Sequence, residues 1–429
     1  MQLKKIIGDV EINKNLLLLL SIGALYSLSI ALSNTFVNVY LWKQSGQFMD
    51  IGLYNLAIVV LQPLTFILAG RWAKKIDRVL VLRLGVIFLA VFFITVLMIG
   101  DSASRYLLLL GSILGMGYGF YWLAFNVLTF EITEPETRDF FNGFLGLLSS
   151  FSGMVGPILS GVIISNMERF TGYKVIFTIS LILFSGAVIL SLFLHRRPCD
   201  GNFDFVRIIK ERKNNFNWKM ITSAHFFQGL REGTFIFIIS VFVFITTNSE
   251  LALGKYSLVN SLVSFVAYYI VTRFIKEKHR KKAILIGGLI LYAAIFLLVI
   301  DLTYTRLIMY AVIIAVAYPL LLVPYMSMTY DVIGQGWNAG EMRIEYIVVR
   351  ELYLNMGRVV SIVLFLGTIF FFDEKTSIPI LLCIVGAGHS LIYLFIRKVE
   401  INKQNRDKKA YKSTISQRKL ADGEGGSTV

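Results

Sequence analysis

The chain has 429 residues, of which 56% are hydrophobic and only 16% are charged, whereas charged residues make up about 25% of a typical soluble domain. A water-soluble body cannot hide this much apolar side chain, because its surface must be covered by polar groups. The 42 Lys and Arg exceed the 27 Asp and Glu and leave a formal net charge of +15. In a chain this apolar, the excess indicates a membrane protein with its basic residues on one side of the bilayer, and it argues against a soluble nucleic-acid-binding protein.

Twelve apolar segments are long enough to cross a bilayer, which takes about 20 residues of helix. They lie at about 15–42, 50–70, 79–100, 106–128, 142–165, 173–194, 219–246, 252–272, 283–300, 307–328, 346–372 and 377–396. The first exceeds the apolar part of a secretory signal peptide, and no small-residue cleavage site follows it, so we expect it to remain as a span. A large soluble helical core is the alternative, but it would need charged helix faces that most of these segments lack.

Basic polar stretches divide these segments into two sets of six. We expect a six-helix bundle at 1–194, a basic cytoplasmic linker at 195–218, a second six-helix bundle at 219–397 and a basic, disordered cytoplasmic tail at 398–429. Most Lys and Arg fall in the linker, the tail and every second connection. By the positive-inside rule, this distribution predicts a multi-pass protein of the cytoplasmic (plasma) membrane with both termini in the cytoplasm.

The second half repeats the first at an offset close to 200 residues. The stretch Thr129-Phe130-Glu131-Ile132 is matched by Thr329-Tyr330-Asp331-Val332, and Tyr118 is matched by Tyr318. Further matched pairs are Gly85 with Gly287 and Thr35-Phe36 with Thr234-Phe235. Parallel repeats of this kind place a central cavity between two bundles that are related by an axis along the membrane normal.

Six helices, a basic linker and six more helices resemble the major facilitator superfamily, over essentially the whole chain up to about residue 400. The resemblance implies an all-α membrane protein with 12 transmembrane helices in two pseudo-symmetric six-helix bundles. It also implies a transporter of a small molecule that works by alternating access in the lipid bilayer. We expect no cofactor, and protons are the expected coupling ion because of the charged residues described below.

The connection between the second and third segments resembles the family's loop signature. The residues that fit are Gly70, Ala73, Lys75 and Arg78. Lys74 stands where the family has an Asp that helps to latch the cytoplasmic gate, which puts a latch of that form in doubt, and Asp77 is the candidate for a substitute carboxylate. Gly70, Asp77 and Arg78 are therefore gating candidates, and the alternative is a basic loop that only anchors the protein at the membrane surface.

An acidic cluster interrupts the otherwise basic cytoplasmic face after the fourth segment. Its members are Glu131, Glu134, Glu136 and Asp139. We expect it to bridge to the basic loop at 71–78 when the inner gate closes; the alternative is a set of solvated loop charges.

The fifth segment carries Ser152, Gly156-Pro157 and Ser160-Gly161, which resembles the antiporter signature of exporters in this family. Gly156 and Pro157 are therefore gating candidates, and the resemblance favours export. Small residues also let two helix backbones approach closely, so the alternative is a packing face without directional meaning.

The fourth segment contains Gly115-Met116-Gly117, but Gly111 occupies the position where proton-coupled members have an Arg. The absence of that Arg disfavours a standard drug–proton antiporter.

Charged residues inside apolar segments are costly and mark candidate pathway or coupling sites. Arg231 and Glu232 lie about 12 residues into the seventh segment, which is about 18 Å along a helix and near the middle of the bilayer. Arg358 lies in the eleventh segment, on the same helix face as Glu351. We expect Glu232 to pair with Arg358, or Arg231 with Glu351. A pair with a protonatable carboxylate gives proton coupling, an unpaired Arg gives an anion site, and a purely structural salt bridge is the alternative.

Polar and aromatic residues within other segments should turn inward, away from lipid. In the first half they are Asn34, Asn38, Tyr118, Trp122 and Asn126, and in the second half Tyr318 and Tyr325. Together they predict an amphipathic, aromatic-lined substrate site; the alternative is hydrogen bonding and packing between helices.

These observations predict a secondary active transporter that moves an amphipathic or anionic small molecule, with Glu232 as proton carrier and with export favoured. Two alternatives stay open: a transporter-like protein that acts as partner or regulator of another membrane protein, and a lipid-moving member of the family. We expect no enzyme, because no nucleophile–base set is visible. The four His and two Cys show no metal-ligand spacing, so we expect no metal. The excess of basic residues is explained by membrane topology, so we expect no nucleic acid as partner.

Overall fold

The computed structural model describes residues 14–132, 135–197 and 201–401, and helices joined by short connections make up this part of the chain. The helices of the first half are α2 (Lys14–Ser45), α3 (Phe48–Lys75), α4 (Arg78–Ile99), α5 (Leu107–Ile132), α6 (Pro135–Ser165) and α7 (Thr171–Leu192), with the short turn η1 (Gly100–Arg105) between α4 and α5. The second half comprises α9 (Phe216–Thr247), α10 (Glu250–Phe274), η2 (Glu277–His279), α11 (Arg280–Ala293), α12 (Phe296–Ile300), α13 (Tyr304–Gly334), α14 (Arg343–Phe371), α15 (Glu374–Gly386) and α16 (Gly388–Ile396).

Within these residues, twelve helical stretches are long and apolar enough to cross a membrane, as predicted. Two of them are interrupted, although each was predicted as one continuous helix. The ninth is divided into α11 and α12, and the twelfth into α15 and α16. Runs of apolar residues predict length but carry no signal for such breaks, because apolar side chains face outward on either side of the break.

The linker contains a short helix, α8 (Phe205–Glu211), that the sequence did not predict. Asp204 caps it by accepting the backbone N–H of Arg207 at 3.0 Å. Ile208 is fully buried, and its carbonyl accepts the indole N–H of Trp218 at 3.1 Å. The linker is therefore packed against the second half at this point. The tail predicted to be disordered lies outside the described residues from residue 402 onward.

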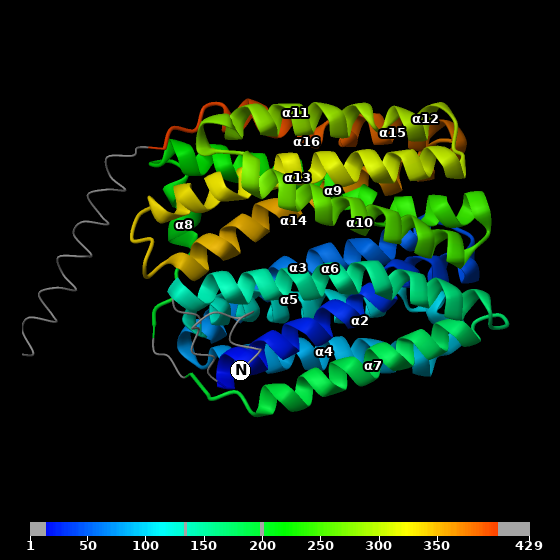
Figure 1. The fold of residues 1–429 in the computed structure, drawn as a ribbon, viewed down its shortest axis with the longest axis horizontal. Coiled ribbons are helices and arrows are strands. Elements are labelled where there is room, and N and C mark those ends of the chain that lie inside the picture. Colours follow the sequence, from blue (N-terminus) through cyan, green and yellow to red (C-terminus); the bar gives the residue numbers. More distant parts are fainter. Residues whose placement is uncertain (1–13, 133–134, 198–200, 402–429) are drawn as a thin grey trace, which may run out of the picture.

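The helices form two bundles stacked on each other, α2–α7 below and α9–α16 above in the view of Figure 1. At the boundary, α3 packs against α14 and α6 against α10. Three large contacts inside the first bundle have counterparts in the second: α3–α5 corresponds to α10–α13, α4–α5 to α11–α13, and α2–α6 to α9–α14. The two halves are thus built on one pattern.

The repeat is visible at single glycines. A Cβ atom on Gly85 of α4 would lie 2.5 Å from the backbone nitrogen of Tyr121 on α5. A Cβ on Gly287 of α11 would lie 2.8 Å from the backbone nitrogen of Leu321 on α13. The glycines that match in sequence therefore make the same helix–helix contact in both halves, because only glycine allows backbones to approach this closely.

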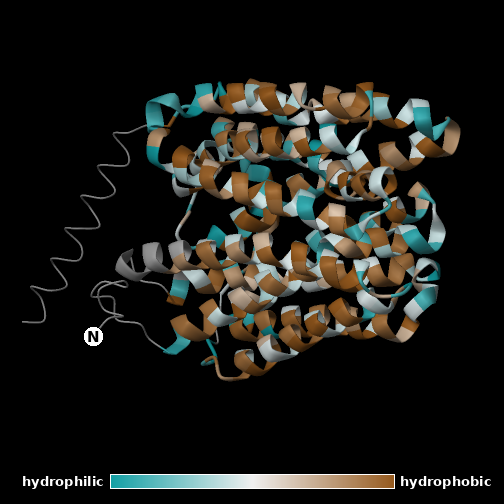
Figure 2. Ribbon diagram, turned by 45° about the vertical axis from the view of Figure 1, so that its right-hand side comes forward, coloured by the Kyte–Doolittle hydropathy of each residue, from teal (hydrophilic) through white to brown (hydrophobic). Residues whose placement is uncertain are grey.

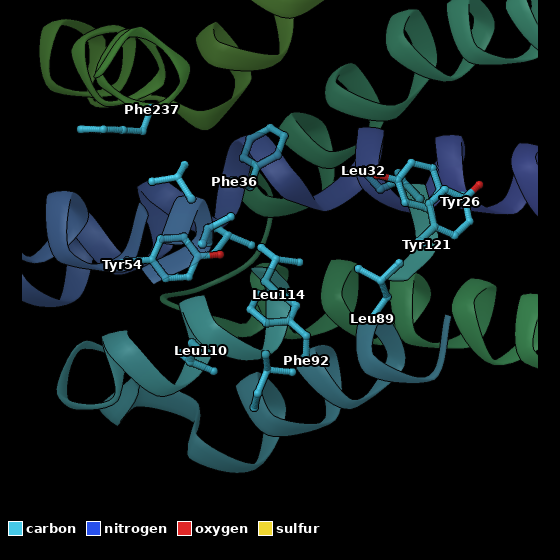
Figure 3. Close-up of a cluster of buried hydrophobic side chains, with 14 of the residues drawn as sticks. Tyr26, Leu32, Phe36, Tyr54, Leu89, Phe92, Leu110, Leu114, Tyr121 and Phe237 are labelled. Atoms are coloured by element: carbon cyan, nitrogen blue, oxygen red, sulfur yellow. The ribbon is translucent and has the colours of Figure 1, made fainter. Parts of the chain in front are cut away.

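The interior of the first half is aromatic and aliphatic. Figure 3 shows Tyr26 and Tyr121 side by side in a buried cluster that extends past Phe36 to Tyr54 and includes leucines of α2, α4 and α5. The rings of Tyr26 and Tyr121 are stacked with their centroids 4.0 Å apart. Hydrophobic residues also follow the outer faces along the length of the bundle, while hydrophilic residues gather at its two ends (Figure 2). This distribution suits a protein surrounded by lipid.

The start of α2, the linker helix α8 and the end of α16 lie at the same end of the bundle (Figure 1). An even number of spans requires this arrangement. The end that carries α8 is called the linker end below.

Candidate functional site

A cavity of about 570 Å³ lies within the second half, between α9, α10, α13 and α14. Its charged lining residues are Arg231, Glu232, Arg350, Glu351 and Arg358. Its aromatic lining residues are Phe235, Tyr256, Tyr310 and Tyr318. The cavity therefore contains the two charged positions of the seventh segment and the two of the eleventh that the sequence singled out.

Close contact between α9 and α14 brings these charges together. A Cβ atom on Gly229 of α9 would collide with the carbonyl oxygen of Leu354 on α14, and one on Gly357 of α14 would collide with the carbonyl oxygen of Phe226. Gly233 makes a similar approach to Arg358. The sequence analysis missed this contact, although the Gly-x-x-x-Gly spacing of Gly229 and Gly233 is a recognised signal for close helix packing in membranes.

Glu232 is bound on both carboxylate oxygens. Oε2 accepts Nη2 of Arg358 at 2.6 Å and its Nε at 3.3 Å. Oε1 accepts Nε2 of Gln228 at 2.8 Å and the hydroxyl of Tyr318 at 3.1 Å. The predicted pairing of Glu232 with Arg358 is confirmed, and the four donors satisfy an ionised carboxylate.

The alternative pairing of Arg231 with Glu351 does not form. Glu351 instead accepts its sequence neighbour Arg350 at 2.6 Å. Arg231 is directed toward α13, where its Nη2 donates to the hydroxyl of Tyr310 at 3.0 Å, and its guanidinium lies 4.5 Å from the centre of the Phe235 ring. The rotation of each helix decides between the two pairings, and the sequence leaves that rotation open.

The polar residues predicted in the first half do not line this cavity. The hydroxyl of Tyr118 donates to Oδ1 of Asn34 at 3.1 Å, and Nδ2 of Asn55 donates to Oδ1 of Asn38 at 2.8 Å. Trp122 packs edge-on against stacked tyrosine rings of α2 and α5, and Asn126 is half-buried on α5. These contacts are the interhelical bonds and packing expected as the alternative, so a role of these residues in substrate binding stays a prediction.

In the second half, Tyr318 lines the cavity but Tyr325 does not. The buried hydroxyl of Tyr325 lies 2.5 Å from Nδ1 of His225, which does line the cavity. His225 was not among the predicted site residues, because a single histidine without a partner at ligand spacing carries no sequence signal.

At the linker end, the two halves are joined by Lys74 and not by Asp77. Nζ of Lys74 on α3 lies 2.5 Å from Oε1 of Glu345, in the first turn of α14. Asp77, only 1% exposed, caps α4 by accepting the backbone N–H of Val79 at 2.7 Å and also accepts Nε of Arg196 at 3.2 Å. Asp77 does not supply the expected substitute carboxylate in this contact. The ion pair between the halves has its positive charge on the first half, at Lys74, and its negative charge on the second, at Glu345. Gly70 packs nearby against side chains of the linker and α14.

The predicted bridge from the acidic cluster to the basic loop is present at Glu131, whose Oε1 lies 2.6 Å from Nε of Arg78. Burial raises the pKa of the Glu131 carboxyl, and the guanidinium groups of Arg78 and Arg197 oppose this rise. Glu134 lies outside the described residues, as do the side chains of Glu136 and Asp139.

At the opposite end, Nζ of Lys43 on α2 lies 2.7 Å from Oε1 of Glu250 on α10, which also accepts the hydroxyl of Tyr173 at 2.9 Å. Ion pairs between the halves therefore lie at both ends of the bundle.

Gly156 and Pro157 lie at helix crossings. Gly156 packs against Ala31 of α2, and the carbonyl of Pro157 faces Gly254 of α10. The packing expected for this motif is present, and a gating role stays a prediction.

Gly111 is also a packing position. A Cβ atom there would collide with the carbonyl oxygen of Tyr54 on α3. At the position of the family's proton-linked Arg, the backbone of α3 therefore lies so close that a side chain larger than that of Gly does not fit. Among the described residues, no group of three His, Cys, Asp or Glu is placed to hold a metal ion.

Comparisons with known proteins agree with this architecture. A family model for the Major Facilitator Superfamily matches residues 19–340. The chain is 61% identical over 403 residues to "Uncharacterized protein YqgE" of Bacillus subtilis (strain 168), covering 94% of each chain. It is 62% identical over 191 residues to "Uncharacterized protein in sodM 3'region" of Geobacillus stearothermophilus, covering 44% of this chain and 89% of that one. The crystal structure of the human organic anion transporter MFSD10 (TETRAN) aligns with a TM-score of 0.62 at 14% identity, over 89% of this chain and 98% of that chain.

Proposed function

Because the chain belongs to the major facilitator superfamily, we propose that it is a secondary active transporter that moves an amphipathic or anionic small molecule by alternating access, coupled to protons through Glu232. The observation that carries the proposal is the pair of Glu232 and Arg358 in the cavity of the second half. The human organic anion transporter MFSD10 has the same fold, and an organic anion as substrate would agree with the Arg-containing cavity.

The coupling follows from the effect of a like charge in an apolar site. A substrate carboxylate that enters the cavity adds a negative charge near Glu232, and a nearby like charge in a buried site favours the neutral, protonated form of a carboxyl group. Anion binding and proton binding are thereby linked in one cavity. When the anion leaves, Glu232 releases its proton and is again the ionised partner of Arg358.

Alternating access requires that the two halves separate at one end at a time. The pairs Lys74–Glu345 and Lys43–Glu250 join the halves at opposite ends and are the contacts that would break in turn. The positive-inside rule assigns the linker end, with both termini, to the cytoplasm of the plasma membrane. The resemblance at Gly156-Pro157 to the antiporter signature favours export.

The test uses proteoliposomes loaded with a pH-sensitive dye, with the membrane potential clamped, to which a panel of aromatic and aliphatic carboxylates is added. Wild-type protein should move protons together with an anion, and Glu232→Gln should reduce this flux to the level of protein-free liposomes. The matched control is Glu374→Gln, which alters an exposed carboxylate in the first turn of α15. The sign of the pH change with each gradient distinguishes cotransport of anion and proton, which the coupling at Glu232 predicts, from exchange, which the antiporter-like motif at Gly156-Pro157 favours.

Proton-coupled flux that persists unchanged in Glu232→Gln would refute Glu232 as the carrier. If no substrate in the panel is moved and one membrane protein co-purifies with the chain, the role of partner or regulator replaces transport. Movement of labelled lipid between leaflets that depends on Arg231 or Arg358 would instead assign the chain to the lipid-moving members.

A further inference from the structure

The charges that line the cavity do not cancel. Arg358 is bound to Glu232 and Arg350 to Glu351, each at 2.6 Å. Within the described chain, no carboxylate forms an ion pair with Arg231, although Arg231 is only 8% exposed. One buried guanidinium therefore has no counter-charge. A charge in this position is costly unless a ligand neutralises it.

The surroundings of Arg231 leave hydrogen-bonding capacity for a ligand. Its Nη2 reaches Tyr310 and its face lies over Phe235, but Nε is buried without a hydrogen-bond partner. The planar fork of a guanidinium matches the two oxygens of a carboxylate. A carboxylate bound here would satisfy both the charge and the open donor.

Two more polar atoms at this cavity lack partners. Nε2 of Gln228 donates to Glu232, but Oε1 of Gln228, a hydrogen-bond acceptor, is buried without a donor. Nε2 of His225 is likewise buried without a partner. Gln228 is 6% exposed and His225 is 1% exposed. Buried polar atoms are normally hydrogen-bonded, so these two atoms favour a ligand that has a polar group with a hydrogen to donate.

Apart from Asn260, whose Nδ2 donates to the carbonyl of Ala311, the rest of the lining is mainly apolar. Ile236 and Ile239 of α9 and Ile314 and Leu322 of α13 line the cavity beside the aromatic rings. A volume of about 570 Å³ falls in the range of small-molecule sites, roughly 300–1,000 Å³.

We infer that the cavity binds an amphipathic monocarboxylate, with its anionic head on Arg231, a hydroxyl or amide hydrogen toward Gln228, and its apolar body between α9 and α13. The inference rests on the proposed function, since it names the substrate class of that same cavity. A cation is disfavoured by the unbalanced positive charge. A dianion would lack a second unpaired guanidinium, because Arg350 and Arg358 each have a carboxylate.

Binding is tested on the purified full chain in detergent with 3-phenyllactate as probe, by calorimetry and by the ligand-induced rise in melting temperature. The affinity of its neutral methyl ester should be lower by roughly tenfold or more, because the ester cannot form the charge-assisted contact. 3-Phenylpropionate, which lacks the hydroxyl, should bind more weakly than 3-phenyllactate. The inference is overturned if the acid and the ester bind equally, or if neither 3-phenyllactate nor its indole analogue, indole-3-lactate, binds. It is also overturned if chloride or inorganic phosphate alone raises the melting temperature as much as the acid does.

The variants are chosen to separate binding from folding. Arg231→Gln should lower the affinity for 3-phenyllactate by roughly tenfold to a hundredfold. Arg231→Lys should lower it by less, because Lys keeps the positive charge but lacks the planar fork of the guanidinium. The control is Arg207→Gln, whose guanidinium lies 4.7 Å from the ring of Trp337 outside the cavity. The elution profile and melting temperature without ligand check that each variant is folded. Unchanged affinity in both Arg231 variants would refute the assignment.

One further variant distinguishes this inference from the proposed function. Glu232→Gln/Arg358→Gln removes the coupling pair and keeps the charge balance of the cavity. It should lose proton-coupled flux and retain the 3-phenyllactate binding that Arg231→Gln weakens. Retained flux would refute the proposed coupling through Glu232 and leave the binding inference standing. Binding that depends on Arg358 and not on Arg231 would refute the assignment of the anionic head to Arg231 and leave the proposed coupling standing.

Discussion

Tyr118 of α5 and Tyr318 of α13 occupy the same position of the internal repeat, but their hydroxyls meet different partners. Tyr118 donates to the amide of Asn34 on α2, and Tyr318 donates to the carboxylate of Glu232 on α9, both at 3.1 Å. Ser33 matches Glu232 at the offset of Thr35 and Thr234, and its hydroxyl donates to the backbone of its own helix at 2.7 Å. The two halves therefore share one framework, and charge enters the second half alone at these positions.

This difference shows how a duplicated fold separates architecture from chemistry. Residues that are repeated, such as Gly85 and Gly287, make the same helix contacts twice. Residues that are not repeated, such as Glu232 and Arg358, create the cavity's charges. Each of the following tests compares a position in the charged half with a matched position.

The largest effect is expected when one partner of the charged pair is removed. Arg358→Gln leaves Glu232 buried without a counter-charge and should destabilise the protein by about 3–5 kcal/mol. The double variant Glu232→Gln/Arg358→Gln removes both charges and should recover much of that loss. Ser33→Ala in the first half should have a far smaller effect. Unfolding in mixed micelles measures all three, and a double variant as unstable as the single one would contradict the comparison.

The next effect concerns the helix contact that brings the charges together. Gly357→Ala places a methyl group against the carbonyl oxygen of Phe226, so α9 and α14 must separate, at a cost of about 1–3 kcal/mol. Gly367→Ala on the same helix has open space around it and is the matched control. Thermal unfolding with and without 3-phenyllactate measures stability and site geometry together. Equal melting temperatures for the two variants would show that the contact is not close.

Removing the matched tyrosine hydroxyls compares a charged with a neutral acceptor. Tyr318→Phe removes a bond to a carboxylate and should cost about 1.5–3 kcal/mol, whereas Tyr118→Phe removes a bond to an amide and should cost about 1 kcal/mol. Only Tyr318→Phe should also alter proton-coupled flux. Equal losses in stability and flux would mean that the charge of Glu232 does not distinguish the two halves.

The smallest effect is expected at the ends of the bundle. Lys74→Gln should favour opening at the linker end, and Lys43→Gln should favour opening at the other end, because each removes one ion pair between the halves. The Lys43–Glu250 pair is partly exposed at Lys43 and should contribute roughly 0.5–1 kcal/mol, so Lys43→Gln should change the accessibility of the cavity about two- to fivefold. Glu345 is fully buried, so removing its partner in Lys74→Gln should change the accessibility by more. The measurement is the labelling rate of a cysteine at Asn260, in a chain without Cys199 and Cys383, with reagents added from either side. Changes of the same sign in both variants would argue against opposed gates.

The sequence by itself determined the number of spans, their division into two halves and the presence of charges near the middle of two helices. These properties are local, since the apolar length of a segment and the rise of a helix follow from consecutive residues. It also narrowed the partner of Glu232 to Arg358, because only a few charges lie at that depth. The sequence did not predict the pairing of Lys74 with Glu345, since nothing in either segment indicates which residues of the two halves contact each other.

The tertiary structure decided which charges are paired and which is left over. Glu232 meets Arg358 because Gly229, Gly233 and Gly357 let α9 and α14 touch, and that contact sets the rotation of both helices. Glu351 then pairs with its own neighbour Arg350, and Arg231 faces Tyr310 across the cavity. The unpaired guanidinium is thus a product of helix rotation and distance, which depend on contacts between residues far apart in the chain.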